Sequence, residues 1–367
     1  MKTADGLTVL RDGEPTRTPA GVVSMLGSTV CLTEAQSGRT SVDFLAAHSG
    51  ARTGAYSVAG TWTPRVTNAT GDLVALAAPS ADPARPEARK QTTIVVAGSA
   101  KEVARVTLPG VIEPDAFSAD GTSLFVLEWL PASAPDHYRV RRLELSTETL
   151  FPLLTRTKIP VPPGKEEEMR GEGRLAVPSP TGSVLYTLYT HQPGHQHTRN
   201  LVSGRPGNVH AFVHTLQTAE GWAFCVDLPA PFGESVGSAH AIALNSNGGR
   251  LFVADVAKGN LARIDTEGLA VENVVKIAQA GEGPAYAVSA SGKLFLGAGK
   301  LVQILGEDGA KLGEWKLPES LRGLALSGDR TRLYVASKKG VAWRDVATGE
   351  QLGEVAVAGL TALVRAA

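Results

Sequence analysis

Five copies of one short pattern recur along the chain and constrain its fold more than any other feature. In each copy an apolar run ends at Ser or Asn, a polar turn of four or five residues with Gly or Asp follows, and Leu then precedes Phe or Tyr. Gly, Asn and Asp tolerate the positive φ of a tight turn, and β-branched and aromatic flanks favour strands, so each copy predicts a β-hairpin. The leucines that mark the copies are Leu124, Leu185, Leu251, Leu294 and Leu333.

A third and a fourth strand follow most of these hairpins. After Leu251 they are "NLARIDTE" and "VENVVKIA", and after Leu333 they are "GVAWRDVATG" and "QLGEVAV". Four short strands that recur about every 40 residues are typical of a β-propeller, whose sheets bury their faces only by packing against neighbours in a ring. No stretch shows helical periodicity of useful length. The predicted fold class is therefore all-β, with four-stranded antiparallel blades.

The count of repeats predicts a seven-bladed β-propeller. A weaker copy is marked by Leu73, and residues 22–58 supply three further strands but no fourth. The last residues, "GLTALVRAA", supply a lone strand, and pairing it with these three completes a blade and removes the exposed sheet edges of an open ring. Residues 1–367 are then expected to form a single domain with blades at 22–58 plus 360–367, 65–108, 116–154, 174–228, 240–277, 285–317 and 321–357.

Composition argues against several classes of function. The 367 residues include 36 basic and 36 acidic side chains, so no net field favours nucleic acid or an anionic membrane surface. The longest apolar runs are far shorter than the roughly 20 residues that a membrane helix needs. The first residues lack the apolar core of a secretory signal, which leaves a cytoplasmic protein or an ectodomain without its leader. Cys31 and Cys225 lie in separate apolar runs and are expected to be buried free thiols.

Two segments resemble known propeller repeats. "RLFVADVAKGNLARIDTE" resembles the YVTN repeat of bacterial seven-bladed propellers, and "VAWRDVATGEQLGEVAV" is similar to the outer half of a WD40 or quinoprotein blade, although the Gly-His and Trp-Asp pairs of WD40 repeats are missing. The resemblance implies a fold but no single function, because such propellers include lactonases, streptogramin-type lyases, surface-layer proteins and interaction platforms. The Ala-, Arg- and Gly-rich composition is similar to that of exported or membrane-tethered actinobacterial proteins, which favours an extracytoplasmic location.

Two insertions interrupt the repeat. The landmark leucines are 43 and 39 residues apart in the last two intervals, but 61 and 66 residues apart between Leu124, Leu185 and Leu251. The first insertion, residues 155–173, has a Pro-rich start and a charge run, and the second, residues 191–209, contains "HQPGHQHTRN". Connections of these two kinds leave a propeller on the same face. Both loops are therefore expected around one entrance of the central channel, where binding residues tend to accumulate.

A set of charged residues is expected beside the same entrance. The inner strand of each repeat begins about five residues before its terminal Ser or Asn, and this count leads to Glu113, Arg174, His240, Pro284 and Arg322. Charged side chains at these places are not needed for packing, and low-dielectric walls would magnify their field. The alternative is simple solvation of a water-filled channel. The predicted ligand-binding set is Glu113, Asp115, Arg174, His240, Glu282 and Arg322.

The histidine-rich insertion suggests a metal site. His195 and His197 would lie about 6.6 Å apart on one side of an extended segment and could share a divalent ion, with His191 as a third ligand. The set could also be completed by His240, Glu113 or Asp136. The alternative is a polar loop whose histidines are merely solvated. Apart from this metal at His191, His195 and His197, no cofactor is expected.

Two functions from different classes remain open. The preferred interpretation is a non-enzymatic propeller outside the cytoplasm that binds a protein or a small molecule on its loop-decorated face. It is preferred because the sequence contains neither a nucleophile elbow nor a phosphate-binding loop. The alternative is a lyase or lactonase acting on a cyclic ester, with or without a divalent ion. In that case His240 is the expected acid or base, Arg322 stabilises negative charge and Glu113 completes the site.

Overall fold

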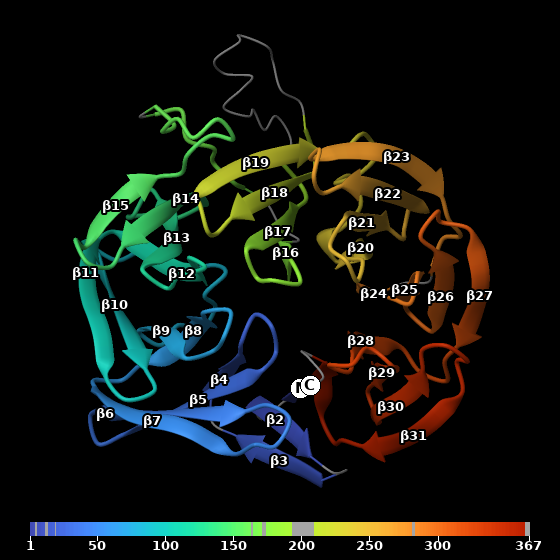
Figure 1. Cartoon of the computed structure of the whole chain (residues 1–367), viewed down its shortest axis with the longest axis horizontal. Coiled ribbons are helices and arrows are strands. Elements are labelled where there is room, and N and C mark those ends of the chain that lie inside the picture. Colours follow the sequence, from blue (N-terminus) through green and yellow to red (C-terminus); the bar gives the residue numbers. More distant parts are fainter. Residues whose placement is uncertain are drawn as a thin grey trace.

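The computed structural model of the chain is built almost entirely of β-strands (Figure 1). It describes residues 1–3, 6–11, 14–18, 20–162, 164–170, 174–192, 209–280 and 283–363. Within these residues the one helical element is a 3-10 turn at Gly237–Ala239, so no helix there is long and apolar enough to cross a membrane. The prediction of an all-β fold with repeated four-stranded antiparallel sheets is confirmed.

The strands of the described residues form eight four-stranded sheets, and seven of these sheets each use four consecutive strands. The first three contain β4–β7 (Ala20–Val23, Thr29–Gln36, Arg39–Ala46, Arg52–Ala59), β8–β11 (Thr63–Thr67, Leu73–Ala77, Gln91–Gly98, Glu102–Pro109) and β12–β15 (Val111–Phe117, Ser123–Leu130, His137–Glu144, Thr149–Pro152). The next two contain β16–β19 (Leu175–Pro178, Val184–Tyr189, Phe212–Gln217, Trp222–Asp227) and β20–β23 (His240–Leu244, Arg250–Asp255, Asn260–Asp265, Ala270–Lys276). The last two contain β24–β27 (Ala285–Ala290, Lys293–Ala298, Leu301–Gly306, Lys311–Lys316) and β28–β31 (Leu321–Leu326, Arg332–Ser337, Gly340–Asp345, Gln351–Ala356).

The sheets follow one another around a ring, which makes the fold propeller-like (Figure 1). In each of the seven sheets the first strand lies toward the centre of the ring and the fourth strand lies on the outside. We call the first strand of each sheet its inner strand. The connections that lead into the inner strands and the turns that leave them therefore lie on opposite faces of the ring.

The eighth sheet contains both ends of the chain, and the predicted count of seven blades is wrong. The order of this sheet is β3-β2-β1-β32, with β1 at Lys2–Thr3, β2 at Gly6–Arg11, β3 at Glu14–Thr18 and β32 at Leu360–Ala362. The C-terminal strand thus pairs with Lys2 and Thr3 and not with residues 22–58. Residues 20–59 form a complete sheet alone, because the run "VVSMLGSTVCLTE" contains a turn and is two strands, β4 and β5, rather than one.

The Ser or Asn that ends most inner strands closes the turn that follows it. Its side-chain oxygen accepts a hydrogen bond from the backbone N–H five residues later and so closes the turn from within. This bond is 2.9–3.1 Å long in six sheets, where the residues are Ser24, Asn68, Ser118, Ser179, Asn245 and Ser327. The shorter turn after Ser289 instead places Ser291 and Gly292 at positive φ.

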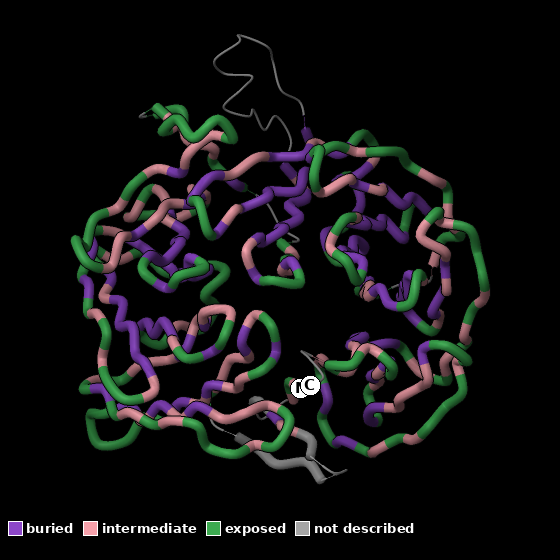
Figure 2. Tube along the Cα trace, in the orientation of Figure 1, coloured by how far each residue is buried: buried purple, intermediate pink, exposed green. Residues whose placement is uncertain are grey.

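The Leu-aromatic pair fills two hydrophobic cores at once. Consecutive side chains of a strand point to opposite faces, so the two residues pack against different neighbouring sheets. Leu251 is buried in a cluster shared with the β16–β19 sheet, and Phe252 is buried in a cluster shared with the β24–β27 sheet. Leu124 and Phe125 are divided between clusters in the same way. Burial is accordingly concentrated in the interior strands of the ring, while turns and outer strands are more exposed (Figure 2).

Candidate functional site

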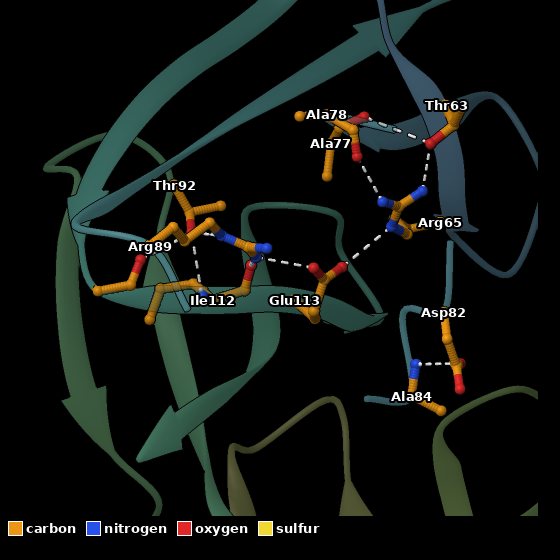
Figure 3. A network of polar contacts seen from close by, with 11 residues as sticks. Thr63, Arg65, Ala77, Ala78, Asp82, Ala84, Arg89, Thr92, Ile112 and Glu113 are labelled. Atoms are coloured by element: carbon orange, nitrogen blue, oxygen red, sulfur yellow. Dashed lines mark hydrogen bonds and ion pairs between the residues drawn. The ribbon is translucent and has the colours of Figure 1, made fainter. Parts of the chain in front are cut away.

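Glu113, in inner strand β12, lies between two arginines of the preceding sheet (Figure 3). Its Oε2 accepts a hydrogen bond from Arg65 Nε at 3.0 Å, and its Oε1 accepts one from Arg89 Nη2 at 2.7 Å. Arg65 belongs to β8, and Arg89 belongs to the connection between β9 and β10. The Glu113 and Arg65 side chains are 3% and 7% exposed, whereas Arg89 is 29% exposed. We call these three residues the Glu113 cluster.

Further hydrogen bonds satisfy the buried charges of the Glu113 cluster. Arg65 and Arg89 also donate to four acceptors around them, the hydroxyls of Thr63 and Thr92 and the carbonyls of Ala78 and Ile112. A buried charge without such partners would be strongly destabilising, whereas a paired and hydrogen-bonded one is tolerated. The cluster therefore joins two adjacent sheets at their inner strands.

A β-bulge in β12 turns the next acidic residue toward the following sheet. Residues two apart on a regular strand face the same side, but the register of β12 shifts between Pro114 and Ala116. Asp115 is the extra residue, and it accepts a hydrogen bond from Nη2 of Arg174, which comes just before β16. Ion pairs thus tie β12 to the sheets on both of its sides.

Burial and charge both act on the groups around Arg174. Its Nε donates to the Tyr189 hydroxyl at 3.3 Å. Burial raises the pKa of Tyr189, and the Arg174 guanidinium opposes this effect. Burial alone would lower the pKa of Arg174, but the Asp115 carboxylate and the phenols of Tyr189 and Tyr138 raise this pKa well above its ordinary value. Arg174 is therefore a fixed cation, and its side chain is 33% exposed.

His240, at the start of β20, is fully buried and bonded to the backbone. Its Nε2 accepts a hydrogen bond from the Gly233 N–H at 3.1 Å, and its Nδ1 lies 3.3 Å from the Val236 carbonyl oxygen. Burial lowers the pKa of His240, although the Asp255 carboxylate, whose Oδ2 is 3.5 Å from Nε2, acts in the opposite direction. A neutral imidazole that donates through Nδ1 and accepts at Nε2 fits these contacts. His240 therefore fixes the connection before β20.

Arg322 lies apart from the Glu113 cluster. It is exposed in β28 and forms no ion pair with any residue that the structure describes. Arg322 acts electrostatically on Tyr286 in the neighbouring sheet. Burial raises the pKa of the Tyr286 phenol, and the positive charge of Arg322 partly opposes this effect. Within the described ranges, no hydrogen bond or ion pair joins Arg322 or His240 to Glu113. Glu282 lies outside the described residues.

The metal hypothesis stays a prediction, because His195 and His197 lie outside the described residues. His191 has a φ of 57°, and its Nε2 is buried without a hydrogen-bond partner among the described atoms. It is close enough to His240 for its charge to lower the pKa of that ring. In the described part of the chain, no group of three or more His, Cys, Asp or Glu side chains is arranged to hold a metal ion.

Contrary to the prediction, the described part of the first insertion does not surround the centre of the ring. Its described part runs along the outer rim beside β15 and β19 (Figure 1). It then returns to β14, where Met169 forms an isolated bridge with Tyr138 and is 1% exposed. Glu166, from the charge run, forms an ion pair with Arg139 at 2.7 Å. The insertion is thus anchored to its own sheet, and most of the second insertion lies outside the described residues.

Arg65 and Arg89 were not among the predicted site residues. A signal for Arg65 was present, because the five-residue count applied to the weaker copy that ends at Asn68 leads to Thr63, whose hydroxyl accepts a hydrogen bond from Arg65. Arg89 lies in the Pro-rich connection "ADPARPEARK", where no repeat position predicts a contact.

Comparisons with known proteins add little to this geometry. No family model matches the chain, and no curated protein matches it. Among solved structures, the chain is similar to a functionally unknown protein from Desulfotomaculum acetoxidans DSM 771, with a TM-score of 0.45 and 12% sequence identity over 88% of this chain and 94% of the other. The propeller-like fold therefore rests on the sheet topology alone.

Proposed function

We propose that this protein is a binding protein whose ligand contacts the face where the inner strands begin. The observation that carries the proposal is a set of solvent-accessible arginines at this face, with Arg89 in the connection between β9 and β10, Arg174 just before β16 and Arg322 in β28. Glu113 and Asp115, which are 3% and 10% exposed, hold two of these arginines in place. A side chain fixed before the ligand arrives loses little conformational entropy on binding, which favours affinity.

The surroundings of His240 support binding rather than catalysis. A general base needs a ring nitrogen within hydrogen-bond reach of the substrate. Both ring nitrogens of His240 instead face backbone groups, and the ring is fully buried. The lyase or lactonase alternative also needs His240, Glu113 and Arg322 around one substrate, and no contact among the described residues connects these three. No observation therefore favours it as a second function.

We also propose three properties from the sequence. The repeats are of a YVTN or WD40-like type, the protein is bacterial and extracytoplasmic, and its partner is a small molecule or a protein rather than nucleic acid. The supporting features are the segment "RLFVADVAKGNLARIDTE" and the balance of 36 basic and 36 acidic residues. Protease treatment of intact cells tests the location, because an extracytoplasmic protein is digested there and a cytoplasmic one survives.

A ligand panel followed by hydrogen exchange tests the binding function. The panel contains carboxylates, phosphates, neutral sugars and lactones, and a rise in the thermal midpoint identifies a ligand. We expect that ligand to protect amides at the starts of β8, β12 and β16 from exchange. Protection confined to the outer strands would reject the proposal, and no ligand in any class would reject a small-molecule partner of these classes. Turnover of a lactone that is lost in His240→Ala would instead establish the enzymatic alternative.

A further inference from the structure

The Glu113 cluster carries one more positive charge than negative charge. Two guanidinium groups, which stay protonated in proteins, share the single Glu113 carboxylate. Asp115 does not supply the balance, because it is paired with Arg174 on the other side of β12. Asp82 lies in the same connection as Arg89, but its carboxylate accepts a hydrogen bond from the Ala84 N–H at 3.0 Å and pairs with neither arginine of the cluster (Figure 3). Within the described residues, no second carboxylate pairs with Arg65 or Arg89, so the excess positive charge of the cluster has no protein counter-ion.

Arg89 is the member of the cluster that can receive a counter-anion. All three guanidinium nitrogens of Arg65 have acceptors, and this side chain is 7% exposed. In Arg89, Nε and Nη2 have acceptors, but Nη1 has none among the described residues, and the side chain is 29% exposed. Thr92, Ile112 and Glu113 hold the guanidinium plane, so Nη1 is a preformed donor. Its field is strengthened by the low dielectric of the protein on its buried side.

We propose that Arg89 binds an oxyanion, a carboxylate or phosphate group of a small molecule, which neutralises the excess charge of the Glu113 cluster. This inference rests on the proposed binding function and specifies the chemical class of its ligand. A guanidinium group suits oxyanions because its N–H donors form short, charge-assisted hydrogen bonds with them. The ligand would lie beside the start of β12, on the side that faces the β8–β11 sheet.

Isothermal titration of the full-length protein with citrate and with inorganic phosphate, at constant ionic strength, tests this site. We expect the wild-type protein to bind at least one of the two, and the one bound more tightly distinguishes a carboxylate from a phosphate ligand. Arg89→Gln should weaken binding roughly 10- to 100-fold, the effect of losing a charge-assisted hydrogen bond. It should still fold, because the neutral Arg65–Glu113 pair remains. The matched control is Arg105→Gln, which removes an arginine paired with Glu102 on outer strand β11 of the same sheet and should bind like the wild type.

A conservative variant separates the charge of Arg89 from its geometry. Arg89→Lys keeps the charge but has no planar guanidinium, so it should bind the anion more tightly than Arg89→Gln and less tightly than the wild type. Equal affinities in the wild type, Arg89→Gln and Arg105→Gln would place the anion elsewhere and overturn the inference, as would the absence of citrate and phosphate binding. If an uncharged compound of the panel binds and both anions fail, the inference is wrong and the proposed binding function stands.

Discussion

At the scale of single residues, charged side chains at the starts of inner strands join neighbouring sheets. The sequence pattern predicted where Glu113, Asp115 and Arg174 lie along the repeat, but not which partners they have. Arg89 was missed because its connection has no counterpart in the other repeats. The sequence gives one hint that Asp115 faces the following sheet, since Pro114 cannot donate a ladder hydrogen bond and Pro within a strand often marks a bulge. Cys31 and Cys225 are both buried, as predicted, and no disulfide joins them.

The buried His240 predicts a pH dependence of stability. Its pKa in the folded protein is lowered below 6.5, mainly by burial, so the unfolded chain binds more protons than the folded chain when the pH lies between the folded pKa and 6.5. Stability from this group is therefore complete above pH 6.5 and is lost as the pH falls through that window. We expect the free energy of unfolding in urea to fall less between pH 7 and pH 5 in His240→Gln than in the wild type.

The control for this measurement is His48→Gln, which replaces an exposed histidine. It should keep the pH dependence of the wild type. If His240→Gln and His48→Gln show the same dependence as the wild type, then His240 is not held neutral by burial.

At the scale of elements, the repeated pattern was predictable because each of its parts has a local physical cause. The terminal Ser or Asn closes its turn by one side-chain hydrogen bond, and the Leu-aromatic pair fills the cores on both faces of the sheet. The hairpin at Ser24 has the same closing bond but has Val30-Cys31 at the positions of the landmark pair. It was therefore missed, and β4 and β5 were taken as one strand.

Removing the aromatic residue of one pair should destabilise the protein strongly. Phe125 is 0% exposed and packs in a cluster with residues of the β16–β19 sheet. Phe125→Ala should lower the free energy of unfolding by about 3–5 kcal/mol, because it removes buried apolar contact and leaves a cavity. Phe151→Ala, at a side chain that is 39% exposed on outer strand β15, should cost less than about 1 kcal/mol. Equal losses in urea unfolding would show that Phe125 does not lie in an inter-sheet core.

At the scale of the whole molecule, the fold class was predictable and the number of sheets was not. The eighth sheet uses N-terminal strands of two, six and five residues, and none carries the landmark pair. Short strands that depend on a distant partner, here β32 beside β1, leave little periodicity in the sequence. The ring nevertheless has the consequence that matters for function, because it places inner strands of neighbouring sheets side by side and lets residues far apart in the chain form ion pairs.

The ring brings the charged starts of neighbouring inner strands into contact, and a double-mutant cycle on Asp115 and Arg174 measures the energy of one such contact. The two residues are separated by 59 positions in sequence and come from different sheets. Urea unfolding of Asp115→Asn, Arg174→Gln and the double variant should give a coupling free energy of about 0.5–3 kcal/mol, whereas Asp115→Asn combined with Arg105→Gln should be additive within about 0.5 kcal/mol. Additive effects for Asp115 and Arg174 as well would show that the ring does not bring these two side chains into contact.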